Sequence, residues 1–525
     1  MSPDAPPVRR RRRRPVGGAG GAADATAGAG AGGEAPLWRG LEGGRFRPLR
    51  DGEVEAVHEA VLELLENLGL SAASEAMIER VTHRGGRLDD DGRLLFPRAL
   101  VGETLADARR SVRLHGQGDD HDIDLGGARA HTSSGGAAPS LLDADSGQYR
   151  AATAKDLFDA ARLVDALDNI HHFSRSLVVA DAPDNFALDI NTAYACLAGT
   201  AKPVAMSVSE PAHVGAIADL CYRVAGGEDA FRAAPFMTIL VCHVVPPMRF
   251  AADACVALEA AIAAGFPVQL ISAGQAGATS PASIAGSLAQ AIAETLAGLV
   301  CARLVDADAK VIFAPKPLVA DLRTGAMSGG GGEQAILMAA AAQMGRFYDL
   351  PTSSIAGITD SKLPDAQHGY EKNLAVSLAL HAGSNLVTQA CGMQASLLGA
   401  SLESYVVDND MLGAILRSVR GVEVNAETLA ADVIAEVCRG EGHYLGHPQT
   451  YARMKRDYVY PQVGDRRTPA QWQEEGSHDM LTRARAEVRR ILDQPRPRHL
   501  ADDVDAYIRA KYPVILSRAQ MDRGG

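Results

Sequence analysis

The sequence is poor in the features that mark several protein classes. Aromatic residues make up only 5% of the chain, and its seven cysteines form no CxxC pair and no spacing typical of zinc ligands. We therefore predict no disulfide framework and no metal site, and interpret the cysteines as reduced packing residues of a cytoplasmic protein. No apolar run approaches the roughly 18 residues of a membrane span, so we predict no membrane partner.

A strong positive charge is also missing from the body of the chain. The net charge of -12 argues against a nucleic-acid-binding protein, because such domains are usually basic. The exception is the arginine run from Arg9 to Arg14, which a Gly/Ala tract follows to about Glu34. A polybasic segment can contact nucleic acid or anionic lipid, but this composition is typical of a disordered, solvated tail. We assign residues 1–44 to such a tail and exclude it from the fold.

The remaining chain has the composition of a globular protein, with 47% hydrophobic and 22% charged residues among 525. Residues 45–125 begin with apolar side chains at helical spacing, which predicts a helical N-terminal subdomain. Residues 126–410 alternate strand-like apolar runs with helical patterns. Residues 411–525 are more charged and predict a C-terminal helical extension that packs against the preceding domain.

The alternation in residues 126–410 indicates the fold. The expected strands lie near His131, Phe173, Met206, Leu240, Leu270, Ile312, Ser354 and Thr388. About eight βα units in roughly 280 residues predict an α/β protein with a (β/α)8 TIM-type barrel. A doubly wound open sheet is the alternative, but such a sheet usually carries a glycine fingerprint after its first strand. The "GGAAPS" that follows His131 is not G-x-G-x-x-G.

Two further motifs each allow a structural and a chemical interpretation. The glycine run Gly329–Gly332 precedes a predicted helix, where free N–H groups attract anions, but it also fits a flexible loop. No Lys-Ser or Lys-Thr follows it, which excludes a P-loop. His443 and His447 are four residues apart, but Gly446 and Pro448 disfavour the helix that would let both bind one metal. Hydrogen-bonding or solvent-facing roles are preferred for both histidines.

The segment Ser354 to Lys372, "SIAGITDSKLPDAQHGYEK", carries more polar chemistry than a strand-to-helix loop needs. Gly357 permits a turn, and Asp365 can cap the helix that follows. Asp360 and Lys362 have no such structural explanation. They are either a solvated pair or functional residues.

This segment resembles the corresponding part of the trimethylamine methyltransferase family. The resemblance continues in "PVQLISAGQAGATSPASIAGSLAQAIAETLAGLVCARLV", "DLRTGAMSGGGGEQAILMAAAAQMGRFYDLP", "SYVVDNDMLGAILRSVRG" and "GHYLGHPQTY". It also covers the N-terminal "FRPLRDGEVEAVHEAVLELLENLGL", so it extends in order from about Arg45 to the last helix. It implies a barrel enzyme that demethylates a methylated amine and passes the methyl group to the cob(I)alamin of a separate corrinoid protein.

One departure from the family pattern bears on the substrate. The position that holds pyrrolysine in founding members falls at about Ile358–Thr359, where this chain has ordinary residues. The resemblance therefore favours the non-pyrrolysine branch, which includes glycine betaine methyltransferase. A quaternary ammonium is already an activated leaving group and needs no covalent handle, so placing its methyl group in line with the acceptor would supply much of the rate.

The resemblance also gives candidate site residues. Aromatic faces and carboxylates normally hold such a cation. We predict Asp360 and Lys362 as catalytic residues, with Lys362 pairing with Asp360 or with a substrate carboxylate. The predicted substrate-binding residues are Ile358, Thr359, Gln367, Tyr370, Phe313, His443 and Tyr444, with Glu371 as a further carboxylate. Lys316 also departs from the family pattern, and it would repel a cation unless it binds the carboxylate of a betaine.

The sequence thus predicts a methyltransferase that moves a methyl group from a quaternary, betaine-type, or other methylated amine to a corrinoid protein. It predicts no tightly bound cofactor, and a homo-oligomer is compatible with it. Two alternatives stay open, namely direct methyl transfer to tetrahydrofolate and a non-catalytic barrel that binds methylated amines.

Overall fold

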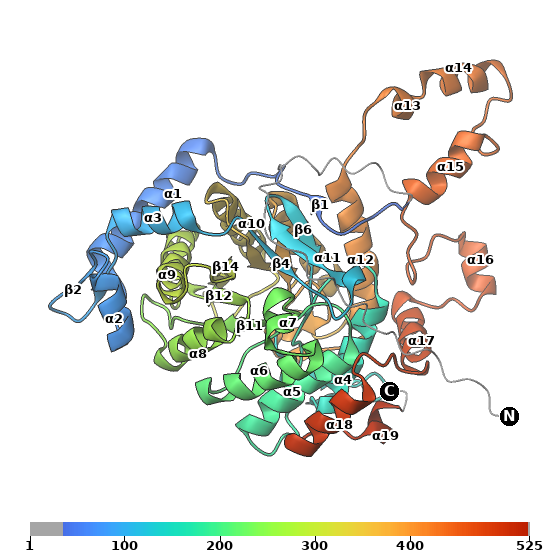
Figure 1. The fold of residues 1–525 in the computed structure, drawn as a ribbon. Coiled ribbons are helices and arrows are strands. Elements are labelled where there is room, and N and C mark those ends of the chain that lie inside the picture. The colour runs from blue at the N-terminus through green and yellow to red at the C-terminus, as the bar shows by residue number, and fades with distance from the viewer. Residues whose placement is uncertain (1–34, 523–525) are drawn as a thin grey trace.

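The computed structural model describes residues 35–522, and its centre is a closed barrel of eight parallel strands (Figure 1). The barrel strands fall into two sheets, one with the order β6–β17–β16 and one with the order β14–β12–β11–β10–β9. The isolated bridges Ser133–His172 and Phe313–Thr352 join the two sheets into one ring. The strands are β6 (Arg129–Thr132), β9 (Phe173–Ser174), β10 (Val204–Met206), β11 (Met237–Val241), β12 (Val268–Ser272), β14 (Val311–Pro315), β16 (Ser353–Ile355) and β17 (Leu386–Thr388). The predicted (β/α)8 barrel is confirmed, and each predicted strand lies at its expected place.

A helix follows each barrel strand and covers the outside of the ring. Because apolar residues recur on the inner side of these helices, they pack on the outward-facing strand residues. They are α4 (Ala154–Ala166), α5 (Asn185–Gly199), α6 (Val214–Ala225), α8 (Ala252–Ala263), α9 (Ile284–Val305), α10 (Gly332–Phe347), α11 (Ala366–Ala382) and α12 (Leu402–Arg420). Among the described residues, only α9 is long and apolar enough to cross a membrane, and most of it is buried against β12, β14 and neighbouring helices.

A hairpin closes the amino-terminal end of the barrel. Strands β4 (Ser111–Leu114) and β5 (Ile123–Gly126) pair antiparallel. Their buried side chains form a cluster, separate from the main core, with Ile312 of β14 and Leu386 of β17. Since Ile312 and Leu386 therefore face inward, the alternation of the strands directs Phe313 and Val387 outward. The barrel is sealed at this end, and access is left to the carboxyl end.

The N-terminal subdomain packs beside α9 and α10. It contains α1 (Asp51–Glu63), η1 (Leu64–Leu68), α2 (Glu75–Thr82), the short hairpin β2 (Arg87–Leu88) and β3 (Leu94–Leu95), and α3 (Arg98–Asp107). The apolar residues Val54, Val57, Val61 and Leu65 are buried, as their helical spacing predicts.

Two predicted boundaries are displaced. Residues 1–34, with Arg9–Arg14, lie outside the described part of the chain, but β1 (Leu41–Glu42) falls within the predicted tail and pairs with β6. The barrel does not end at residue 410, because α12 continues to Arg420 as its eighth helix. A two-residue strand has too little pattern to be recognised before its partner is known.

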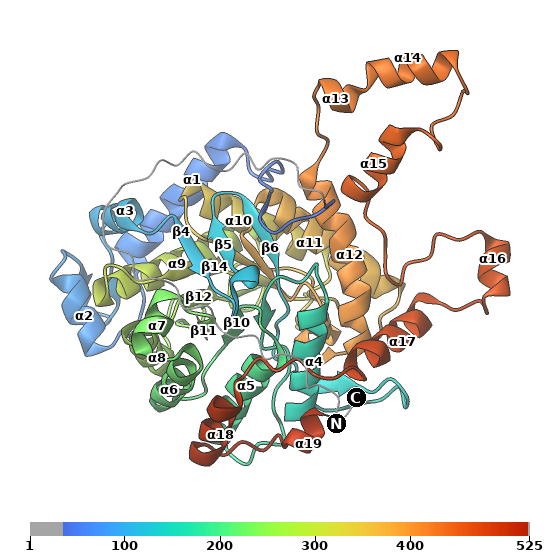
Figure 2. The same ribbon diagram turned by 45° about the vertical axis from the view of Figure 1, so that its right-hand side comes forward.

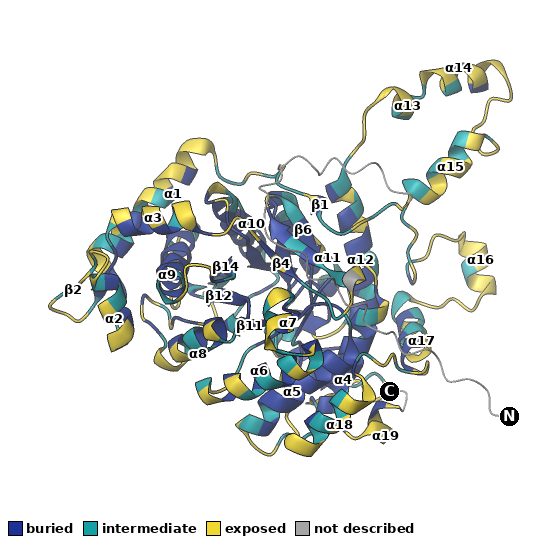
Figure 3. Cartoon of the chain, viewed as in Figure 1, coloured by how far each residue is buried: buried dark blue, intermediate teal, exposed yellow. Residues whose placement is uncertain are grey.

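The C-terminal extension has two parts. Helices α17 (Met480–Leu492), α18 (Asp502–Lys511) and α19 (Arg518–Met521) return to the barrel, where α17 packs on α12 and α4. Before them, the chain leaves the barrel as an arm, which we define as residues 422–460. It carries α13 (Ala426–Leu429), α14 (Ala431–Arg439) and α15 (Pro448–Arg456), and α16 (Pro469–Glu474) follows. The arm stands apart from the barrel in both views, and most of its surface is exposed (Figures 2 and 3).

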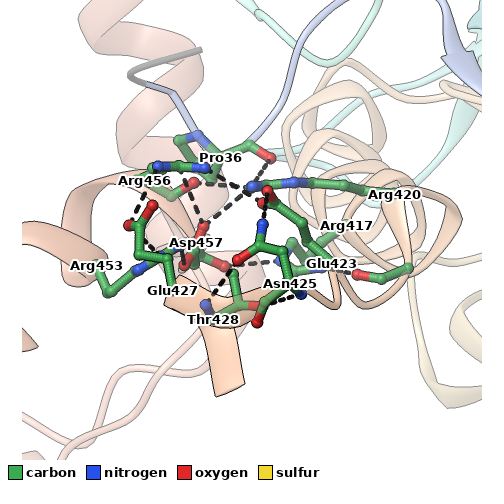
Figure 4. Close-up of polar contacts among 11 residues, drawn as sticks. Pro36, Arg417, Arg420, Glu423, Asn425, Glu427, Thr428, Arg453, Arg456 and Asp457 are labelled. Carbon is green, nitrogen blue, oxygen red and sulfur yellow. Dashed lines mark hydrogen bonds and ion pairs between the residues drawn. The ribbon is translucent and has the colours of Figure 1, made fainter. Parts of the chain in front are cut away.

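The base of the arm is held by ion pairs (Figure 4). Arg420, the last residue of α12, contacts the Asp457 carboxylate at 3.0 Å and donates to the carbonyl oxygens of Arg456 and Pro36. Arg453 also pairs with Asp457, and Arg456 pairs with Glu423. These contacts bring the two ends of the arm together at the carboxyl end of α12. Since barrel helices run antiparallel to the strands, the arm leaves from the end of the barrel opposite its mouth.

Candidate active site

The carboxyl end of the barrel is open to solvent. Ile239 and Val241 of β11 are buried in the core, whereas Leu240 between them is partly exposed, and Ile271 of β12 behaves in the same way. Cys242, which follows β11, is exposed. Exposed side chains on the inner face of strands that are covered outside by helices indicate an open interior. In this fold, that is where substrate sites lie.

Lys316 lies in this interior, directly after β14. Its side chain is buried, and its ammonium donates to Thr388 Oγ1 of β17 at 2.9 Å and to Gln269 Oε1 of β12 at 3.3 Å. Burial lowers the pKa of Lys316 from 10.5 to about 7. Both hydrogen-bond acceptors are neutral, so the charged form is poorly compensated.

Two other buried lysines show how this chain stabilises a buried ammonium. Lys202 donates to three backbone carbonyls, those of Val164, Leu167 and Ile170. Lys372 contacts the Asp408 carboxylate at 2.6 Å. Among the described residues, Lys316 is the buried lysine that has neither a carbonyl cage nor a carboxylate.

Other groups near Lys316 are also polar. His172 Nδ1 lies 2.7 Å from Ser133 Oγ, while its Nε2 is buried without a partner. Burial lowers the pKa of His172 to about 3, and the Lys316 charge adds to this effect. Although solvent reaches the Cys242 side chain, its enclosure within the barrel raises the pKa of the thiol, while the charges of Lys316 and Arg175 oppose the rise. The interior therefore collects cationic and neutral groups.

Asp360 organises the loops at the barrel mouth. Its carboxylate accepts hydrogen bonds from Ser396 Oγ at 2.5 Å, Gly329 N at 2.8 Å, Ser328 Oγ at 3.1 Å and Gly330 N at 3.3 Å. These donors belong to the loops that follow β14 and β17. The glycine run was a candidate anion site, and the anion that its Gly329 and Gly330 N–H groups bind is the Asp360 carboxylate of the same chain.

The residues around Asp360 form one hydrogen-bonded unit. Glu371 of α11 is buried and accepts from Thr359 Oγ1 at 2.6 Å, Asp360 N at 2.9 Å and Gln367 Nε2 at 2.8 Å. Ile358 packs against the glycine run so closely that a side chain at Gly329 would clash with it. The loop is therefore fixed by its own side chains.

Comparison with known proteins decides which family this barrel represents. The model of a family described as trimethylamine methyltransferase matches residues 18–514. The chain belongs to the trimethylamine methyltransferase family. It is 30% identical over 471 residues to a trimethylamine methyltransferase of Desulfitobacterium hafniense, covering 90% of this chain and 94% of that protein. It is 28% identical over 467 residues to a glycine betaine methyltransferase of the same species, covering 89% and 96%. A solved monomethylamine methyltransferase of Methanosarcina barkeri is 12% identical and covers 84% of this chain and 92% of that one, with a TM-score of 0.47.

As a member of the trimethylamine methyltransferase family, the chain is a methyltransferase, and its predicted site residues can be placed on the barrel. Thr359, Asp360, Gln367 and Glu371 meet at the mouth. Tyr370 is exposed beside them, and partial desolvation followed by the neighbouring carboxylates, chiefly that of Glu371, raises the pKa of its phenol. Lys362 is exposed, and its ammonium donates to the Asp360 carbonyl oxygen at 2.6 Å, not to the carboxylate.

Three predicted residues lie elsewhere. Phe313 faces the helix layer, where its ring centroid is 6.1 Å from that of Tyr348. Strand alternation turns it away from the interior, so it does not line the pocket. His443 and Tyr444 lie on the arm and are exposed, and His443 contacts only its neighbour Glu441 among the described charged groups. The structure does not bring these three residues to the mouth of their own barrel.

The residues in the barrel interior around Lys316 were not predicted as site residues from the sequence. Ser133 and Lys316 stand at predicted strand ends, but nothing in the sequence places His172, Gln269 and Thr388 around Lys316. That grouping depends on strand order and register. The described residues contain no group of three or more His, Cys, Asp or Glu side chains that could hold a metal.

Proposed function

We propose that this enzyme transfers a methyl group from a quaternary amine to the cob(I)alamin of a separate corrinoid protein. The observation that carries the proposal is the filled loop at Ile358–Thr359. Ile358 is buried against Gly329, and Thr359 is bonded to Glu371, so neither offers a group that could form an adduct with an amine. A quaternary amine needs no such adduct, because its nitrogen has no lone pair to mask.

The open carboxyl end fits an acceptor that arrives on another protein. The bound cob(I)alamin would supply the nucleophile, and this chain would supply orientation and exclude water around the methyl group. Asp360 would act as a positioning residue, since it ties together the loops after β14, β16 and β17. The free cysteines support the predicted cytoplasmic location.

The exposed arm supports the predicted homo-oligomer. Val422, Leu445 and Tyr451 are among its exposed apolar residues, at 85%, 89% and 66% exposure. Several exposed apolar side chains on one segment are a common feature of interfaces.

The proposal is tested by mixing the pure enzyme with a reduced corrinoid protein and a panel of quaternary and tertiary amines, while following the absorbance of methylcobalamin. We expect turnover with at least one quaternary amine and none with trimethylamine. Absence of turnover with every quaternary amine, for enzyme with intact circular dichroism, would refute the proposal. Methyl transfer to tetrahydrofolate without corrinoid would show that the acceptor is a folate. Amine binding without transfer to either acceptor would show that the protein is a non-catalytic barrel that binds methylated amines.

A further inference from the structure

Lys316 lacks the counter-charge that its burial requires. A buried ammonium is strongly destabilised unless it is paired and hydrogen-bonded. Its two contacts, to Thr388 Oγ1 and Gln269 Oε1, are with neutral groups, and no carboxylate of the described residues lies near enough to affect its charge. Lys202 and Lys372 have the compensation that Lys316 lacks.

The surroundings of Lys316 favour an anion. The guanidinium of Arg175 and the ammonium of Lys316 both act on Cys242, which is reached by solvent. His172 Nε2 is a buried polar atom without a hydrogen-bond partner, and the charge of Lys316 acts on that ring. An uncompensated cation and an orphaned ring nitrogen within a barrel that is open at its carboxyl end are the groups left over when a ligand completes the site.

Resting on the function proposed above, we propose that Lys316 binds the carboxylate of the methylated amine. The substrate class is then a zwitterion with a quaternary nitrogen at one end and a carboxylate at the other. Lys316 lies inside the barrel and Asp360 at the mouth, so a carboxylate held by Lys316 directs the methylated nitrogen toward the mouth. There the methyl groups face an incoming acceptor.

This arrangement also resolves a charge conflict. A lysine in a pocket for a simple cation such as tetramethylammonium would repel the ligand. With a zwitterion, the same lysine attracts one end and sets the distance of the other. Lys362, the alternative carboxylate partner, is exposed to water and already donates to the Asp360 carbonyl oxygen, so its contribution would be screened.

The test measures binding by calorimetry, with glycine betaine and tetramethylammonium as probes. These two share the quaternary nitrogen and differ in the carboxylate. Wild type should bind glycine betaine at least tenfold more tightly, and Lys316→Met should lose about 10- to 100-fold in betaine affinity with no loss toward tetramethylammonium, as for one charge-assisted contact. Lys316→Gln, which can keep the hydrogen bonds to Thr388 and Gln269, serves as a second variant should Lys316→Met not fold.

The matched control is Lys310→Met at the opposite end of β14, where the side chain donates to the Arg232 carbonyl oxygen, and it should leave both affinities unchanged. Lys362→Met tests the alternative carboxylate partner at the mouth. Equal affinity of wild type for both probes, or a betaine preference that survives Lys316→Met and Lys316→Gln, would overturn the assignment. Methyl transfer from amines without a carboxylate, unaffected by Lys316→Met, would overturn it while leaving the proposed function intact. Betaine binding that depends on Lys316, without any methyl transfer, would support the assignment of Lys316 and refute the proposed function.

Discussion

Asp360 shows how a residue that looks catalytic in the sequence can act through other residues. Both of its carboxylate oxygens are engaged by the loops after β14 and β17. A carboxylate that accepts four hydrogen bonds is more useful as a fixed anchor than as a base. Its negative charge still lies at the mouth, where the proposed substrate carries its positive nitrogen.

We expect Asp360→Asn to lower both stability and turnover. The amide retains one accepting oxygen but turns its NH2 group toward either the Gly329 or the Gly330 amide, which bond to different oxygens of Asp360, so the unfolding free energy should fall by about 1–3 kcal/mol. Urea denaturation measures this change. Asp365→Asn is the control, since asparagine also caps helices, and it should cost only a few tenths of a kcal/mol. Equal losses for the two variants would contradict the anchoring role.

Lys316 should make stability depend on pH. Its native pKa is lowered to about 7, so between pH 7 and 10.5 the unfolded chain binds more protons than the native protein, and stability rises with pH in this window. Lys316→Met removes the cost, and we expect it to be more stable than wild type by about 1–3 kcal/mol at pH 7, with the difference shrinking toward pH 10. Thermal unfolding across this range checks the trend.

Lys202→Met provides the contrast. It removes the ammonium donor from the carbonyls of Val164, Leu167 and Ile170, and should destabilise the protein at pH 7. A Lys316→Met protein that is less stable than wild type at pH 7 would show that the buried ammonium is compensated after all.

At the scale of elements, a buried ion network joins α11, α12 and the loop after β17. Asp408 of α12 contacts Lys372 at 2.6 Å and His368 at 2.8 Å, and it accepts from Gly392 N at 2.8 Å. The nearby loop also holds Ala395, Ser396 and Leu397 at positive φ, a conformation that costs about 1 kcal/mol per residue. Ser396 uses this conformation to reach Asp360.

We expect Asp408→Asn to reduce the unfolding free energy by about 3 kcal/mol or more. The shape is retained, but the Lys372 ammonium is left buried without a counter-charge. Chemical denaturation measures the loss. The double variant Asp408→Asn with Lys372→Met should recover part of it, because it removes the orphaned charge. Additive losses in the double variant would show that the two residues do not act as a pair.

At the scale of the whole molecule, one end of the barrel is sealed and the other is open. The hairpin β4–β5 fills the amino end with Val112, Leu114, Ile123 and Leu125, and the active-site loops surround the carboxyl end. The arm leaves from the sealed end, where Arg420 and Asp457 hold its base. Its apolar surface is therefore remote from its own active site.

We expect replacement of residues 424–456 by a short Gly/Ser linker to leave the barrel folded but to lower its oligomeric state. The arm's ends are adjacent at Arg420 and Asp457, so a short linker can bridge them. Light scattering measures the mass and thermal unfolding the stability. A variant with the wild-type mass would contradict the role of the arm in assembly, while the single substitution Leu88→Ser, of an exposed side chain in the N-terminal subdomain, controls for altered solubility.

The sequence alone determined the barrel, its strand positions and its family, because period-two and helical patterns are local and recur eight times. It also marked the loop at Ile358–Asp360. The direction of Phe313, the position of His443 and Tyr444 on an arm, and the grouping of Lys316 with Gln269, Thr388 and His172 were decided only by the tertiary structure. Those features depend on which strands are neighbours and on their register. Distances between side chains far apart in the chain follow from barrel closure, which no local pattern encodes.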